Sequence, residues 1–298
     1  MRWKGQRKSS NVEDRRGQSS TGRGIGGINP LLIGPLLRFL FSKKGLLILG
    51  LFFTISLLTG NNPISYIGQI FGVSSGTQTG VTYTGSAQEN ELAEFSKTIL
   101  ASTEDIWHGL LENYREPTLV LFTNSVNSAC GFASSATGPF YCPGDEKLYI
   151  DLGFFKEMEQ QLKAPGDFAQ AYVIAHEVGH HVQNLMGITD RMNRIRSQVS
   201  KTEYNKYSVR LELQADFLAG VWAHHSQQMK NWMETGDLEE AINAANAIGD
   251  DRLQKNATGR VVPDSFTHGT SKQRMFWFMK GYKTGDLSQG DTFNEKSL

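Results

Sequence analysis

Cysteine is almost absent from this chain of 298 residues, which contains only Cys130 and Cys142. The two do not form a Cys-x-x-Cys pair, so the sequence gives no reason to expect a zinc site built from cysteine. They are separated by a loop that contains glycine and proline, and in an oxidising compartment such a pair usually forms a disulfide. In the cytoplasm the same residues would be two free thiols.

Net charge is also absent, since 30 Lys and Arg balance 30 Asp and Glu. The balance conceals an asymmetry, because residues 1–44 carry ten basic and two acidic side chains while the rest of the chain carries 20 and 28. A basic head before an acidic body suggests membrane topology more than nucleic-acid binding, and no nucleic-acid partner is expected. Residues 1–27 are rich in Gly, Ser and Arg and cannot build a core, so part of the head is predicted to be disordered.

Long apolar runs are scarce, and only residues 45–60 form an uncharged, strongly apolar stretch. This stretch is slightly short for a membrane span, but no charge follows it until Glu89, so the span can extend. We therefore predict a basic cytoplasmic head over 1–44, a transmembrane signal anchor over 45–62 and a flexible linker over 63–88. A cleavable signal peptide is a poorer explanation, because the leader is too long and no Ala-x-Ala-like site follows the apolar run.

The remaining residues, 89–298, are predicted to form one mostly helical α+β domain with a small sheet. A capping box at Ser86–Glu89 opens a helix, and residues 118–123 and 147–152 have the composition of strands. No internal repeat is present, and the last dozen residues are expected to form a loose tail.

A His-Glu-x-x-His motif is the strongest chemical signal in the chain. An uncharged run leads into it, with Asp167 as the expected N-cap and Gly187 as the expected stop, so the motif is predicted to lie on a core helix. Residues four positions apart share one face of a helix, so His176 and His180 can bind one Zn²⁺ ion together. Glu177 can remove a proton from a water molecule that the metal activates.

Zinc needs a third protein ligand besides an open position for water. The metzincin continuation is excluded, because its glycine and histidine are replaced here by Gln183 and Met186. A predicted helix over 208–225 offers Glu212 as the third ligand and Asp216, one turn later, as the acceptor for the free ring N–H of a ligand histidine. Two carboxylates beside an apolar stripe are unfavourable unless a cation neutralises them. The alternative is a surface helix whose acids are simply solvated.

These motifs resemble the gluzincin arrangement of zinc metallopeptidases, and the chain is similar to a bacterial family of neutral zinc metallopeptidases. The resemblance runs nearly end to end, through Asn11–Gly17, Ser128–Gly131, Gly138–Pro143, His176–Gln183, Glu212–Asp216 and Ser265–Gly269. It implies a zincin-like fold, one Zn²⁺ ion per chain on His176, His180 and Glu212, and Glu177 as general base. It also implies a peptide or protein substrate, without saying which one.

The resemblance further implies a short basic N-terminal segment, one membrane anchor and a single catalytic domain. Together with the charge pattern, it predicts a single-pass protein of the bacterial inner membrane. Its N-terminus would be cytoplasmic, the bilayer would be bound through the one anchor, and the catalytic domain would be periplasmic or extracellular.

Several other side chains are candidates for supporting roles. His268, in a loop just before a helix, is the first candidate for stabilising the transition state, although a purely structural histidine fits as well. Tyr141 and Tyr149 are weaker candidates for that role. His181 points away from the ligand face and is expected to pack in the core or to support a ligand residue. By analogy with gluzincins, residues 149–152 are expected to form the rim on which an extended substrate adds as a strand. The remaining histidines are expected to be structural or exposed: His108, His224 and His225.

We therefore expect a membrane-anchored zinc metallopeptidase. The alternative is a catalytically silent envelope interaction module that uses zinc structurally, and its signature would be a lost base or a fourth protein ligand. An intramembrane protease is excluded, because the His-Glu-x-x-His motif lies far beyond the only candidate span.

Overall fold

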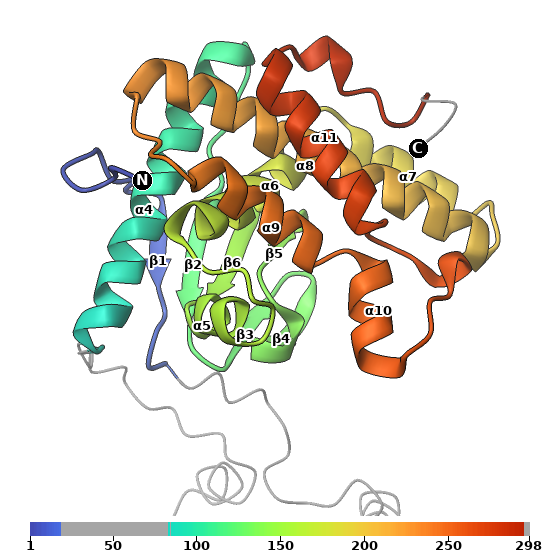
Figure 1. Ribbon diagram of the computed structural model, residues 1–298, viewed down its shortest axis with the longest axis horizontal. Coiled ribbons are helices and arrows are strands. Elements are labelled where there is room, and N and C mark those ends of the chain that lie inside the picture. Colours follow the sequence, from blue (N-terminus) through green and yellow to red (C-terminus); the bar gives the residue numbers. More distant parts are fainter. Residues whose placement is uncertain (19–82, 84, 295–298) are drawn as a thin grey trace, which may run out of the picture. The chain divides into compact units, whose positions relative to one another are not determined.

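Helices dominate the computed structural model, which describes residues 1–18, 83 and 85–294 (Figure 1). The helices are α4 (Ala87–Leu110), α5 (Gly153–Gln160), α6 (Asp167–Leu185), α7 (Ile188–Arg196), α8 (Lys201–Lys230), α9 (Asp237–Ala247), α10 (Asp250–Thr258) and α11 (Ser271–Thr284). The strands are β1 (Val12–Asp14), β2 (Thr118–Phe122), β3 (Ser125–Ser128), β4 (Gly131–Ser134), β5 (Phe140–Cys142) and β6 (Lys147–Asp151). The predicted mostly helical α+β fold is confirmed for this part of the chain.

The predicted membrane anchor over 45–62 lies outside the described residues. Within the residues that are described, no helix is both long enough and apolar enough to cross a bilayer.

The main sheet has the strand order β1-β2-β6-β5. Its first three strands are parallel and β5 is antiparallel to β6, while β3 and β4 form a separate hairpin. The two predicted strands are confirmed as β2 and β6, whose central residues are fully buried. Because β6 lies between β2 and β5, its backbone is paired on both sides. The edge strands are β1 and β5, so the prediction that residues 149–152 form a substrate-binding rim is wrong.

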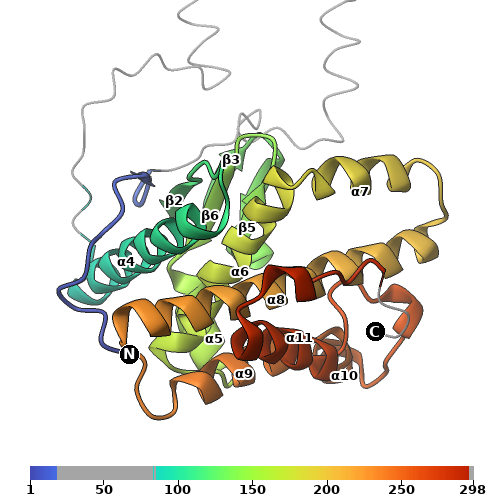
Figure 2. The same ribbon diagram turned by 90° about the horizontal axis from the view of Figure 1, so that it is seen from above.

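Helix α6 lies at the centre of the described unit, between β5 and the helices α8 and α9 (Figure 2). It begins at Asp167, directly after Gly166, whose φ of 113° is a left-handed conformation that favours glycine. Asp167 is therefore the first helical residue and does not act as the N-cap. Helix α8 is longer than predicted at both ends, and it packs along α6 and α11.

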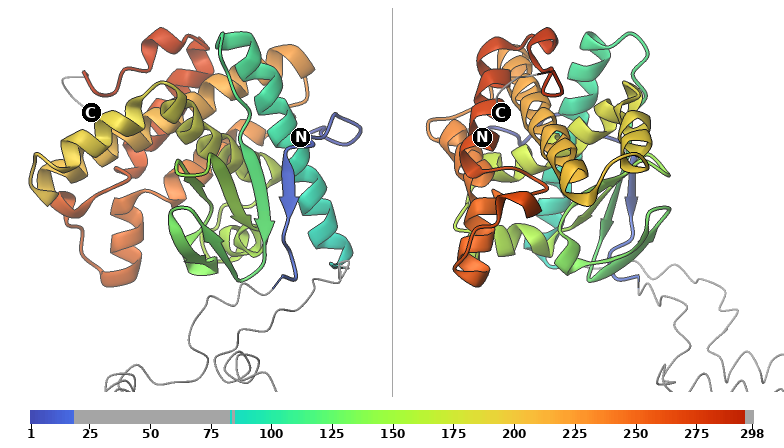
Figure 3. Two further views of the ribbon diagram at one scale, coloured as in Figure 1. Left: turned by 180° about the vertical axis from the view of Figure 1, so that it is seen from behind. Right: turned by 90° about the vertical axis from the view of Figure 1, so that its right-hand side faces the viewer.

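Residues 1–18 do not form the disordered head that was predicted. Strand β1 pairs in parallel with β2, with Val12 opposite Leu119, and it forms the edge of the sheet beside α4 (Figure 3). Near the start of the chain, the backbone N–H of Arg2 donates to the carbonyl of Trp232 over 2.7 Å. This segment and residues 85–294 belong to the same compact unit.

A buried carboxylate on α4 explains part of this docking. Glu104 is only 1% exposed, and its partners come from the N-terminal segment. Arg7 donates to it over 2.8 Å, Asn11 donates over 3.0 Å, and the Ser9 hydroxyl donates as well. A buried carboxylate is unfavourable unless it is paired, so α4 needs these partners.

Other basic groups near the N-terminus bind acids of the same unit. Lys4 pairs with Glu91 and Lys8 with Glu94. The α-amino group of Met1 lies 2.9 Å from Asp167. The positive charge of this segment thus neutralises part of the acidic body, which is a role that the charge count alone did not reveal.

The C-terminal segment is also more ordered than predicted. The Thr292 hydroxyl donates to the carbonyl of Arg210 over 2.6 Å, and the Gln214 amide donates to the carbonyl of Gly290 over 2.9 Å. Through these two hydrogen bonds, residues beyond α11 are held against α8, the helix that carries Glu212.

Candidate metal centre

Close packing of α6 on α8 creates the site. Gly179 lies between the two histidines of the motif, and a Cβ atom there would be 3.0 Å from the Ala215 carbonyl oxygen and 3.2 Å from its Cα. A larger residue would push the helices apart, because such distances are shorter than normal contacts. Glycine therefore allows α8 to approach until Glu212 reaches the histidines.

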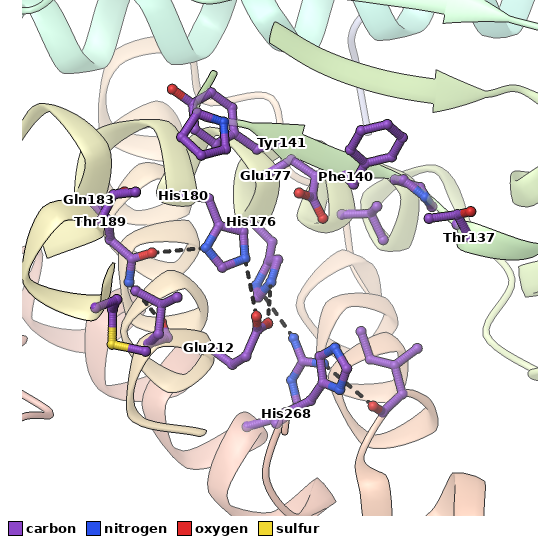
Figure 4. A pocket seen from close by; sticks show the side chains of 18 of the residues that line it. Thr137, Phe140, Tyr141, His176, Glu177, His180, Gln183, Thr189, Glu212 and His268 are labelled. Atoms are coloured by element: carbon purple, nitrogen blue, oxygen red, sulfur yellow. Dashed lines mark hydrogen bonds and ion pairs between the residues drawn. The ribbon is translucent and has the colours of Figure 1, made fainter. Parts of the chain in front are cut away.

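Two ring nitrogens and one carboxylate converge at this contact (Figure 4). Glu212 Oε2 lies 3.1 Å from His176 Nε2, and Glu212 Oε1 lies 3.5 Å from His180 Nε2. The donor atoms all lie within 4.8 Å of one another. Two imidazoles and one carboxylate are a donor set of catalytic zinc sites, so the residues present fit this metal.

The His176 ring is oriented by a charged partner. Its Nδ1 lies 2.9 Å from Asp216 Oδ1, and since the carboxylate can only accept, the ring nitrogen carries the hydrogen. This leaves the Nε2 lone pair free for a metal. Asp216 also accepts two 2.8 Å hydrogen bonds from Arg274 and one from the Tyr172 hydroxyl. Burial alone would raise the pKa of Asp216, but Arg274 and His176 outweigh it and hold that pKa below its ordinary value.

The His180 ring is oriented by a neutral partner that the sequence did not reveal. Gln183 Oε1 lies 2.8 Å from His180 Nδ1. The Gln183 amide nitrogen donates to the Leu211 carbonyl over 2.7 Å, which fixes the orientation of the amide and turns its oxygen to the ring. Gln183 follows His180 by one helical turn, and that spacing was the available signal.

Negative charge exceeds positive charge at the site. Glu177, Glu212 and Asp216 are three carboxylates, whereas Arg274 is a single fixed cation, and all are buried or nearly so. Burial lowers the pKa of His176, but Asp216 and Glu212 outweigh this effect and raise it. A divalent cation would neutralise the excess charge, which is the second observation that fits zinc.

Glu177 lies next to the ligands but does not bind them. It is 8% exposed and lines the same cavity as the histidines (Figure 4). Burial raises the pKa of its carboxyl group, while the nearby histidines oppose that rise and the Tyr141 backbone hydrogen-bonds to it. The Glu177 carboxylate therefore lies in the cavity beside the three ligand candidates without being one of them.

His268 faces the cavity across from Tyr141 and Phe140 (Figure 4). Its Nδ1 lies 3.2 Å from Asp250 Oδ1, and its backbone N–H donates to Asp250 Oδ2 over 2.6 Å. The hydrogen bond that the His268 ring donates to Asp250 raises the pKa of His268. Asp250, the first residue of α10, was missed in the sequence because no local spacing links it to His268.

The weaker candidates have other partners. The Tyr141 hydroxyl binds His181 and Asn184, and the Tyr149 hydroxyl donates to Asp145, so neither hydroxyl is placed for catalysis. His181 is fully buried and its Nε2 hydrogen-bonds to the carbonyl of Arg115, which confirms that it points away from the ligands. The remaining histidines bind Glu116 or backbone carbonyls: His108, His224 and His225.

The predicted disulfide between Cys130 and Cys142 is present. It joins the β3–β4 hairpin to β5 and thereby fixes the strand that borders the cavity. Closing so short a loop contributes about 2–3 kcal/mol in the chain-entropy description.

The sequence comparisons agree with this chemistry. A profile of the family described as "Putative neutral zinc metallopeptidase" matches residues 1–293. The chain belongs to this family. At the level of the family it is therefore a zinc-dependent peptidase, as the sequence resemblance predicted.

Relatives cover most of the chain. "Uncharacterized protein YpfJ" of Escherichia coli (strain K12) is 48% identical over 299 residues, which cover 99% of this chain and 99% of that protein. "Uncharacterized protein Rv2575" of Mycobacterium tuberculosis (strain ATCC 25618 / H37Rv) is 42% identical over 208 residues, which cover 66% of this chain and 69% of that protein. No solved structure matches the chain.

Proposed function

We propose that this chain hydrolyses peptide bonds with one Zn²⁺ ion held by His176, His180 and Glu212. The observation that carries the proposal is the convergence of two imidazoles and a carboxylate within 4.8 Å, beside a buried glutamate that is not one of them. Among the described residues, no fourth histidine, cysteine or acidic group completes this cluster. A position is therefore left for water or substrate, which distinguishes a catalytic zinc site from a structural one.

Glu177 is the proposed general base. Bound to the three ligands, zinc would polarise the scissile carbonyl and lower the pKa of a water molecule in the cavity. Glu177 would accept a proton from that water and deliver it to the leaving amine. Its contact with the Tyr141 backbone would hold the carboxylate in place during both transfers.

His268 is the proposed donor to the oxyanion that forms on the substrate. Asp250 holds the ring at Nδ1 and favours its protonated form, so Nε2 can donate into the cavity. Because Asp250 also accepts backbone hydrogen bonds from Thr267 and Gly269, it fixes the loop that carries His268.

Strand β5 is the proposed docking edge for the peptide. It is antiparallel to β6 on one side and lies at the end of the sheet on the other. An extended peptide could add there as a further strand, in the way that peptides commonly bind to sheet edges. The scissile bond would then pass Glu177, which contacts the backbone of Tyr141.

The test is cleavage of a mixed, fluorescence-quenched peptide library by the zinc-loaded full chain. Glu177→Gln is the matched control, because it keeps size and hydrogen bonding but removes the base. We expect the variant to bind zinc normally and to lose about 10²–10⁴-fold in kcat/KM. If both proteins bind zinc and neither cleaves, the silent interaction module replaces the peptidase as the better account.

For the compartment, we propose that residues 1–18 and the catalytic unit lie on the same side of the membrane. Strand β1 is hydrogen-bonded to β2, and no bilayer can separate two paired strands. A cytoplasmic N-terminus with a periplasmic catalytic domain would require that separation. This argues against the predicted single-pass topology, and the Cys130–Cys142 disulfide favours the oxidising, periplasmic or extracellular side.

Cysteine labelling of the full chain in membranes tests this proposal. Ser10→Cys and Ser197→Cys are nearly isosteric changes at exposed positions of the two parts. We expect a membrane-impermeant maleimide to label both from the same side, in intact spheroplasts or in inverted vesicles. Labelling of the two positions from opposite sides would restore the single-pass arrangement.

A further inference from the structure

We propose that the site is an endopeptidase site that accepts an apolar side chain next to the scissile bond. This inference rests on the proposed function and adds its substrate class. It comes from the groups that line the cavity around Glu177, whose volume is about 510 Å³. That volume is typical of sites that enclose a few residues of a ligand.

Among the residues that the structure describes, the cavity offers no charged group that is free to bind a chain terminus. An aminopeptidase needs a carboxylate for the substrate's ammonium group, and a carboxypeptidase needs a cation for its carboxylate. Apart from Arg274, the acidic side chains and histidines that line the cavity within the described residues already have proposed roles in zinc binding and catalysis. They are His176, Glu177, His180, Glu212 and His268.

Arg274 is not free to bind the terminus of a peptide substrate. It is 2% exposed, and both Nε and Nη2 donate to Asp216 over 2.8 Å. Nη2 also lies 3.3 Å from the Tyr172 hydroxyl, and Nη1 lies 3.4 Å from the carbonyl of Ile248. Turning this guanidinium toward a substrate carboxylate would leave Asp216 buried without its cation, which is strongly unfavourable.

An apolar wall lies beside the proposed base. Val173 precedes Glu177 by one helical turn and so lies on the same face of α6. Phe140, Phe154 and Ile248 line the same cavity. Each of these side chains packs on one of the two hydrophobic clusters of the unit. A charged substrate side chain would lose its hydration there without gaining a partner, whereas an apolar one would be stabilised.

The cavity extends to both sides of the reacting groups. Figure 4 shows Thr137 and Phe140 beyond Glu177, and Thr189 and Gln183 beyond His180. Residues before and after the scissile bond can therefore both be accommodated. A cavity that is open on both sides, and in which no described group is free to bind a chain end, is what internal cleavage of a peptide requires.

A matched peptide series tests the inference with the zinc-loaded full chain. The peptides carry Phe, Leu, Lys or Asp at one position beside the scissile bond, and each is made with free ends and with acetyl and amide ends. We expect Phe and Leu to exceed Lys and Asp by about 100-fold in kcat/KM. Blocking the peptide ends should change kcat/KM by less than about threefold, because no described group of the cavity is free to bind them.

Two results would overturn the inference while leaving the peptidase intact: cleavage that requires a free end, or equal cleavage of charged and apolar peptides. If no peptide in the series is cleaved by the wild type, the proposed function itself fails, and the inference fails with it.

Phe154→Glu sharpens the test of the apolar wall. It should raise the kcat/KM ratio of the Lys peptide to the Phe peptide by about tenfold, because the new carboxylate would pair with lysine. Phe132→Glu is the control, since Phe132 is 62% exposed and does not line the cavity. An unchanged ratio in Phe154→Glu, with the variant folded and active, would remove Phe154 from the specificity pocket.

Discussion

Two buried carboxylates hold distant parts of this molecule together, and they do so with different partners. Asp216 on α8 is fully buried, and its cation, Arg274 on α11, is only 2% exposed. Glu104 on α4 is buried to a similar extent, but its cation, Arg7, is 47% exposed. The first carboxylate contacts a proposed zinc ligand, whereas the second fixes residues 1–18 against α4.

The difference shows how burial of the cation decides what such a pair does. Removing a buried partner leaves an uncompensated charge and is strongly destabilising, whereas a partner at the surface can be replaced in part by water. We therefore expect the Asp216 pair to control both stability and metal binding. The Glu104 pair should contribute less to stability and nothing to the metal site.

The largest effect is expected for Arg274→Ala. It should reduce the free energy of unfolding by about 3–5 kcal/mol, because Asp216 would remain buried without a cation. Urea unfolding of the zinc-loaded and zinc-free protein measures this effect. Arg274→Lys, which keeps the charge but loses the paired hydrogen bonds, should fall between the wild type and Arg274→Ala. A loss below about 1 kcal/mol would mean that Arg274 is not needed to neutralise Asp216.

A smaller effect, confined to the metal, is expected for Gln183→Leu. Loss of the acceptor at His180 Nδ1 should weaken zinc binding by about 10–100-fold, which competition with a chromogenic chelator measures independently of activity. Gln183→Glu keeps an acceptor at the ring but loses the hydrogen bond to the Leu211 carbonyl, so its zinc affinity should fall between those of the wild type and Gln183→Leu. Equal zinc affinity in Gln183→Leu and the wild type would show that the ring is oriented by packing alone.

The smallest effect is expected for Arg7→Ala. It should destabilise the protein by about 1–2 kcal/mol, since Arg7 is half exposed and Ser9 and Asn11 still bind Glu104. Zinc affinity should not change. Lys4→Ala, which removes an exposed pair with Glu91, is the control and should stay within about 0.5 kcal/mol. A loss of zinc affinity in Arg7→Ala would contradict the separation of the two roles.

The metal-site helices were predictable because their signals are local. His176, Glu177 and His180 follow one another on α6, and Glu212 and Asp216 are one turn apart on α8. Helical periodicity alone therefore assigns each side chain to a face. That these two faces meet was implied only by the resemblance to known peptidases, and the structure brings them together.

The N-terminal segment was not predictable in this way. Strand β1 is short, partly polar and paired with a strand more than a hundred residues later, so neither composition nor periodicity marks it. Glu104 gave no clear signal either, because several other polar residues of the helix that begins after Ser86 are buried with it. The rim was assigned to β6 by analogy, whereas the order of the strands places β6 inside the sheet and leaves β1 and β5 at its edges.

The most direct test of the central claim is the zinc content of the purified full chain, compared with Glu212→Ala and Asp237→Ala. Asp237 belongs to a second acidic group, with Asp167 and Glu240, that could hold a metal. We expect about one zinc per chain in the wild type and in Asp237→Ala, and almost none in Glu212→Ala. Full zinc content in Glu212→Ala, or its loss in Asp237→Ala, would contradict the assignment of the metal to His176, His180 and Glu212.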